Sequence, residues 1–84
     1  MDPDPKICKA IVQHLTSRAN KHDHLDGIIL AVVEAEAKRI TEKITRNVGF
    51  LLSVGVVKER PGESERSSYE LAIEASELDK FLKK

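Results

Sequence analysis

Apolar residues at steps of three and four run through the middle of the chain and stop shortly before a glycine. This stripe consists of Val33, Ala37, Ile40, Ile44, Val48 and Leu51. Such spacing places the side chains on one face of an α-helix. A single helix over residues 26–53 would be about 40 Å long, and its first half would have little to pack against in so short a chain. We therefore predict two helices, with a break around residues 36–40 and Thr41 as the N-cap of the second helix.

The residues after this stripe change from a helical to an alternating pattern. Gly55 favours the left-handed conformation that ends helices, and residues 56–60 have the composition of a strand. Pro61 and Gly62 open a polar loop that is too long for a two-residue hairpin turn. Farther on, Tyr69, Leu71 and Ile73 alternate with Glu70, Ala72 and Glu74. We predict an antiparallel two-stranded hairpin over residues 56–73.

The first part of the chain predicts another helix. Residues 1–5 read as an extended lead in which Asp4 is a helix N-cap and Pro5 takes the first helical position. Helical spacing follows, with an apolar face made of Ile7, Cys8, Ile11, Val12 and Leu15. We expect this helix to end near residues 18–20.

A polar segment separates this helix from the next one. Residues 20–24 are turn-like, and Leu25 is the apolar residue that can anchor a short strand or bridge there. Asp26 is the next N-cap candidate. The aliphatic run over residues 28–33 fits either a buried strand or a buried helix, and the alanines and glutamates after it favour helix.

The end of the chain predicts a short helix over residues 76–84, with Ser76 as its cap. Its apolar edge consists of Leu78, Phe81 and Leu82, which either close the core or join a second copy of the chain. Because a core of this size is marginal by itself, we expect self-association, and this edge is the predicted homodimer contact.

Length and charge limit the classes of function. The chain has 84 residues, too few for a second core, with 14 basic and 14 acidic side chains. Zero net charge argues against strong non-specific binding to a polyanion. However, residues 38–66 carry seven bases and four acids, so the middle of the chain is basic.

The order of three helices, strand, loop, strand and helix resembles the winged helix-turn-helix family of DNA-binding domains. The most specific similarity is the spacing of Ile44, Val48, Leu51, Gly55 and the pair Val56-Val57. The resemblance implies an α+β fold in which residues 1–84 form one domain with a three-helix core, a two-stranded wing and a short C-terminal helix. It further implies a small transcriptional regulator that places residues 41–53 in the major groove of double-stranded DNA, with the wing as an auxiliary contact.

The resemblance also assigns residues to the DNA contact. The predicted set is Lys38, Arg39, Thr41, Lys43, Thr45, Arg46, Asn47, Lys58, Arg60 and Arg66. The outward positions of the recognition helix would be Thr41, Glu42, Lys43, Thr45, Arg46 and Asn47. Arginine and lysine can bridge the acceptors of guanine, and asparagine can pair with adenine. The basic wing residues would contact phosphates.

Some residues depart from this pattern. Gly49 lies inside the predicted recognition helix, where glycine costs about 1 kcal/mol relative to alanine and needs a packing reason, which a close helix crossing would supply. Glu59, Glu63 and Glu65 lie in or beside the wing and would repel phosphate. The alternative is therefore a winged-helix module for protein–protein interaction in a larger assembly. A winged helix that binds RNA is a third hypothesis.

Cys8 and three histidines suggest a metal site, but their spacing is a weak signal. Cys8 fits the buried face of the first helix, and we place His14, His22 and His24 among solvated polar residues. We therefore expect no metal, no cofactor, no catalytic residues and no enzymatic activity. Without a signal peptide or long apolar run, we expect a cytoplasmic protein, or a nucleoid-associated or nuclear one if it binds DNA, with no membrane partner.

Overall fold

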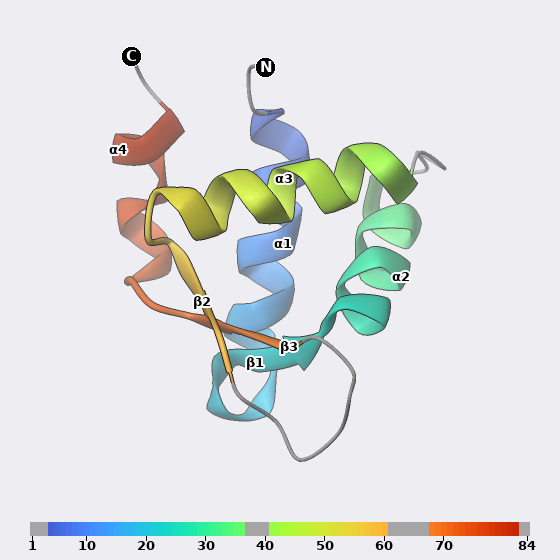
Figure 1. Ribbon diagram of the computed structural model, residues 1–84, viewed down its shortest axis with the longest axis horizontal. Helices are drawn as coiled ribbons and strands as arrows, with labels where there is room; N and C mark the ends of the chain where they lie inside the picture. Colours follow the sequence, from blue (N-terminus) through green and yellow to red (C-terminus); the bar gives the residue numbers. More distant parts are fainter. Residues whose placement is uncertain (1–3, 37–40, 61–67, 83–84) are drawn as a thin grey trace.

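The computed structural model describes residues 4–36, 41–60 and 68–82 (Figure 1). In these residues the helices are α1 (Pro5–Ser17), α2 (Leu25–Glu36), α3 (Thr41–Ser53) and α4 (Leu78–Leu82). The strands are β1 (His22–His24), β2 (Val57–Glu59) and β3 (Ser68–Leu71), and short 3₁₀ turns span Ala19–Lys21 and Ala75–Glu77. The predicted α+β class is confirmed, and this layout is compatible with a winged-helix arrangement.

Helix α1 begins where the N-terminal lead presents a carboxylate to the helix end. Oδ1 of Asp4 accepts hydrogen bonds from the backbone N–H groups of Lys6 at 3.0 Å and Ile7 at 3.4 Å, and Pro5 follows the cap. These contacts confirm the predicted N-cap, because they satisfy donors that have no partner inside the helix. The helix ends at Ser17, just before the predicted region.

The apolar stripe is divided between two helices, as predicted. Helix α2 ends at Glu36 and α3 begins at Thr41, and residues 37–40 between them lie outside the described part of the chain. Two details of the prediction are wrong. Asp26 lies in the first turn of α2 and does not cap it, because the helix already begins at Leu25. Thr41 is likewise the first residue of α3 and not the residue before it.

Gly55 ends α3 in the way that its sequence position suggests. Its φ angle is +85°, in the region that glycine adopts without strain. Its N–H donates to the carbonyl of Leu52 at 3.2 Å, and the N–H of Val56 donates to the carbonyl of Leu51 at 2.9 Å. This pair of bonds is a Schellman motif, and it turns the chain from α3 directly into β2.

The described strands form one antiparallel sheet in the order β1-β3-β2. The predicted antiparallel pairing is found in β2 and β3, in which Val57 lies opposite Leu71, but β3 ends at Leu71 and does not reach the predicted end at Ile73. The sheet is larger than this hairpin, because β1 adds a third strand with His22 opposite Glu70. The loop residues 61–67 lie outside the described part.

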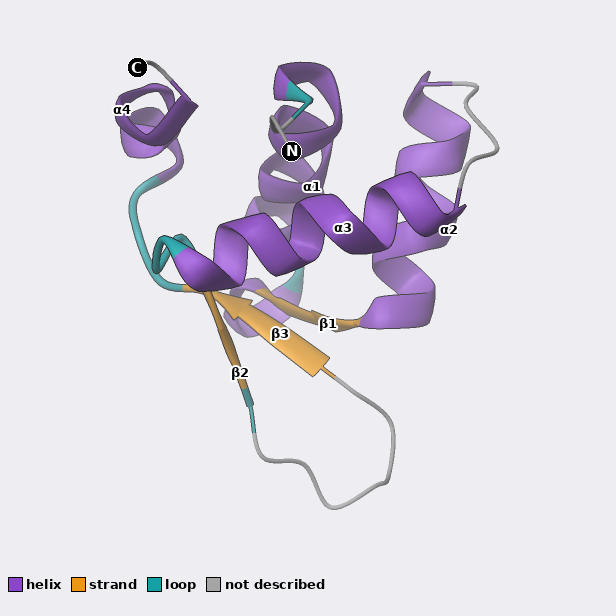
Figure 2. Ribbon diagram, turned by 45° about the horizontal axis from the view of Figure 1, so that its top comes forward, coloured by secondary structure: helices purple, strands orange, loops and turns teal. Residues whose placement is uncertain are grey.

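The helices and the sheet share one core. Figures 1 and 2 show α3 crossing α1, with α2 on one side, α4 on the other and the sheet beneath. The buried apolar residues include Ile7, Cys8, Ile11, Leu15, Ile28, Val32, Ile44, Val48, Leu51, Val56, Val57, Tyr69, Leu71 and Leu78. Because α3 faces this core along one side only, its opposite side is left exposed.

The C-terminal segment differs from the prediction. Ser76 lies inside a 3₁₀ turn and does not cap a helix, since α4 begins at Leu78. Leu78 is buried, whereas Phe81 and Leu82 are half-buried against the same core. Leu78 therefore closes the core, and the predicted dimer contact retains only Phe81 and Leu82. In the described part of the chain, no helix is long and apolar enough to cross a membrane.

Candidate nucleic-acid interface

The exposed side of α3 carries most of the polar residues that were predicted to lie there. Thr41, Glu42, Lys43, Thr45 and Arg46 are all exposed. Asn47 is the exception, because only 3% of its surface is accessible. The prediction that Asn47 faces outward is therefore wrong.

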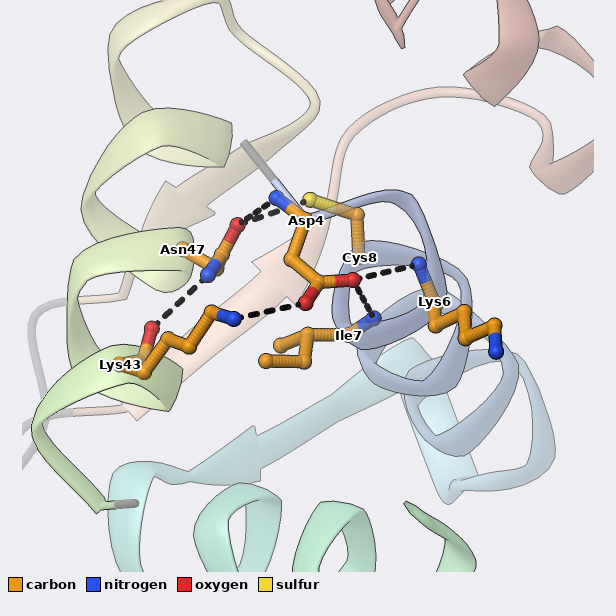
Figure 3. Close-up of polar contacts among 6 residues, drawn as sticks. All are labelled: Asp4, Lys6, Ile7, Cys8, Lys43 and Asn47. Carbon is orange, nitrogen blue, oxygen red and sulfur yellow. Dashed lines mark hydrogen bonds and ion pairs between the residues drawn. The ribbon is translucent and has the colours of Figure 1, made fainter. Parts of the chain in front are cut away.

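Asn47 is buried because Asp4 and the first turn of α1 pack against it (Figure 3). Its Oδ1 accepts the backbone N–H of Asp4 at 2.8 Å and the thiol of Cys8 at 3.4 Å. Its Nδ2 donates to the carbonyl of Lys43 at 2.8 Å. With both ends of its amide engaged, Asn47 ties α1 to α3 and does not present a base-reading group to solvent.

Lys43 is connected to the same cluster through its side chain. Its Nζ lies 3.0 Å from Oδ2 of Asp4, while Oδ1 of that carboxylate caps α1 (Figure 3). The hydrogen bond from Lys43, supported by the backbone N–H groups of Ile7 and Lys6, holds the pKa of Asp4 below its usual value, although burial alone would raise it. Lys43 is thus an exposed cation that already has a carboxylate partner.

Arg46 and Glu42 form an ion pair one helical turn apart on the outward side of α3. Their side chains are 54% and 72% exposed. Beside them, the hydroxyl of Thr45 donates to the carbonyl of Thr41 at 3.0 Å. The outward side of α3 therefore presents one arginine–glutamate pair and the methyl group of a threonine whose hydroxyl is engaged.

Gly49 continues this exposed side. An added Cβ there would meet no atom of the described residues within 4 Å. The prediction that a close helix crossing explains this glycine is therefore wrong. Its energetic disadvantage in a helix is not offset by packing in the described part of the fold.

The predicted wing contacts are only partly within the described residues. Lys58 and Arg60 lie on or next to β2 and are exposed, and Nε of Arg60 is 3.6 Å from Oε1 of Glu70 on β3. Lys38, Arg39 and Arg66 lie outside the described residues, as do Glu63 and Glu65. The structure brings Thr41, Glu42, Lys43, Thr45 and Arg46 together on α3.

A second polar cluster joins α1 and β1, and no pattern in the sequence indicated it. Nε2 of His14 lies 2.6 Å from Oδ2 of Asp23, whose Oδ1 accepts the N–H of His24 at 2.7 Å. The side chains of His14 and Asp23 are only 18% and 13% exposed, so the expectation of a solvated His14 is wrong. Burial alone would raise the pKa of Asp23, but its hydrogen bonds and nearby cations lower it.

Cys8 is fully buried, as predicted, and burial raises the pKa of its thiol to about 11. Such a thiol is a poor nucleophile. Within the described ranges, no group of three or more histidine, cysteine, aspartate or glutamate side chains is arranged to hold a metal ion.

Comparison with known proteins identified no family model, no curated relative and no solved structure that matches this chain.

Proposed function

We propose that this protein is a winged helix-turn-helix regulator that binds double-stranded DNA, with α3 in the major groove and β2 and β3 as the wing. The observation that supports this proposal most strongly is that α3 has one buried side and one exposed side. Ile44, Val48 and Leu51 are buried against α1 and α2, while Arg46 on the opposite side is more than half exposed. A helix held in this way can enter a groove without losing its packing.

The distribution of charge supports the same proposal. Lys43 and Arg46 lie on α3, and Lys58 and Arg60 lie at β2, which α3 enters directly through the turn at Gly55. Lysine and arginine contacts to phosphate provide most of the affinity of DNA-binding proteins and make it depend on salt. The sequence of the wing also contains Glu59, Glu63 and Glu65, which would repel phosphate, so we expect α3 and not the wing to dominate the contact.

The test is a fluorescence anisotropy titration with mixed-sequence duplex DNA at about 50 mM and about 200 mM salt. Arg46→Ala should weaken binding about fivefold or more, the loss of one base or phosphate contact. Arg18→Ala is the matched control, because the Arg18 side chain is also 54% exposed and also lies near a carboxylate, but is next to α1. It should leave affinity nearly unchanged.

Two results would contradict the proposal. One is a titration that stays flat at low salt. The other is an equal effect of Arg46→Ala and Arg18→Ala, which would mean that α3 is not the contact. Circular dichroism of both variants separates loss of binding from loss of folding, and competition with structured RNA distinguishes duplex DNA from RNA as the ligand.

A second candidate function is a protein-interaction module, and Leu30 favours it. This residue on α2 is 62% exposed, so its apolar side chain is available for contact with another protein. A stoichiometric protein partner that is captured by the wild-type chain, lost with Leu30→Gln and free of nucleic acid would support this function over DNA binding.

A further inference from the structure

We infer that the exposed side of α3 recognises a G·C base pair, through Arg46 and Glu42 acting together. The inference rests on the proposed function, and it adds which base pair the helix prefers and which two residues set that preference. It follows from the contacts made by five polar side chains of α3, which are Glu42, Lys43, Thr45, Arg46 and Asn47.

Three of the predicted readers have partners that turn their polar atoms away from a base. Asn47, the residue suited to adenine, is buried with its amide bonded to Asp4, Cys8 and Lys43. The ammonium of Lys43 is held by the carboxylate of Asp4 at 3.0 Å. The hydroxyl of Thr45 is bonded within the helix. The adenine-reading group is thus removed from the surface.

Arg46 and Glu42 remain on the outward side, and their chemistry is complementary to one base pair. In the major groove a G·C pair presents two acceptors, guanine N7 and O6, followed by one donor, the cytosine amino group. The arginine offers paired N–H donors and the glutamate offers an acceptor one turn away. An A·T pair would place its adenine amino donor against the arginine donors.

The ion pair between these side chains adds a second reason. Because Glu42 holds the Arg46 guanidinium on the helix surface, less side-chain freedom is lost when the arginine meets guanine. A guanidinium carries five N–H donors, so contact with Glu42 is compatible with contact to a base. Glu42, which would otherwise repel DNA, then contributes to specificity by accepting from cytosine.

The experiment is selection from a pool of duplexes with a randomised core, sequenced after binding to the folded wild-type chain. The same selection is made with Arg46→Ala, Glu42→Gln and, as a control for phosphate contact, Lys58→Ala. The wild-type protein should enrich sites that share a G·C pair at one position, with a preference of about fivefold or more over A·T there. Arg46→Ala should abolish that preference, and Glu42→Gln should weaken it.

Lys58→Ala should weaken binding to all sequences equally and keep the G·C preference. The inference is overturned if the shared position is A·T, or if Arg46→Ala enriches the same base as the wild-type chain. Neither result would contradict the proposed function, because the chain would still bind duplex DNA. If the pool shows neither binding nor enrichment, the proposed function fails and the base preference fails with it.

Discussion

The same substitution should have opposite effects at two glycines. Gly49 lies in α3 and Gly27 lies in α2, so alanine is favoured by helix propensity at both positions. At Gly49 an added Cβ meets no described atom within 4 Å. Gly49→Ala should therefore increase the free energy of unfolding by about 0.8–1.0 kcal/mol.

At Gly27 the added Cβ would lie 2.7 Å from Cγ of Asp23 and closer still to Oδ2 of the same carboxylate. The carboxylate cannot move away without losing contacts, because His14 lies 2.6 Å from Oδ2 and the N–H of His24 lies 2.7 Å from Oδ1. Losing one hydrogen bond to a charged group costs about 1.5–3 kcal/mol. After the gain in helix propensity, Gly27→Ala should be destabilising by about 1–2 kcal/mol.

Urea denaturation followed by circular dichroism measures both variants, and their unfolding free energies should differ by about 2–3 kcal/mol. Asp23→Ala provides the internal control. In that background the Cβ added at position 27 no longer meets a carboxylate, so Gly27→Ala should become stabilising. The reasoning is refuted if Gly27→Ala stabilises the otherwise wild-type chain, or if the Asp23→Ala background does not change the sign.

Three further results are expected. The pKa values of Asp4 and Asp23 are below the usual 3.8, so their contribution to stability is present above that pH and is lost as the pH falls through the lower folded-state pKa. Between about pH 7 and about pH 2, the melting temperature of Asp23→Asn should therefore fall less than that of the wild-type chain. An equal fall in melting temperature would contradict this. Asp4→Asn retains a capping oxygen but breaks the pair with Lys43, so affinity for duplex DNA should rise about two- to fivefold. Asp79→Asn makes the same charge change at an exposed pair with Lys9, and equal effects of the two variants would argue against competition between Asp4 and DNA. Cys8, with its pKa raised to about 11, should react with iodoacetamide at about pH 8 roughly 100-fold more slowly than a free thiol, and a similar rate would show that it is not buried.

The features that could be predicted from the sequence depend on neighbours in the chain. Asp4 caps the helix that begins at the next residue, and Gly55 ends the helix directly before it. The division of the apolar stripe into α2 and α3 was also predictable, because one long helix would have left half of its face without a partner.

The features that could not be predicted depend on residues far apart in the chain. A short strand or bridge was expected next to Leu25, but its partner was not: β1 lies at the polar residues 22–24, Leu25 already belongs to α2, and β3 pairs with β1. Asn47 lies three residues after Ile44 and four before Leu51, so helical spacing already places it beside the buried face, but its partner, the N–H of Asp4, could not be seen in the sequence. Gly49 suggested a helix crossing that the described packing does not contain. The partners of β1 and Asn47 are tertiary contacts, which the local sequence pattern does not contain.

The central claim is that the exposed side of α3 is the surface that meets DNA. Amide chemical shifts from ¹⁵N-labelled protein, recorded during titration with a duplex taken from the selection, test it most directly. The largest changes should fall on Thr45, Arg46 and Gly49, with small changes at Lys9 and Asp79 on the side of the fold where α1 meets α4. Changes concentrated at Lys9 and Asp79, or no changes at saturating duplex, would contradict the account.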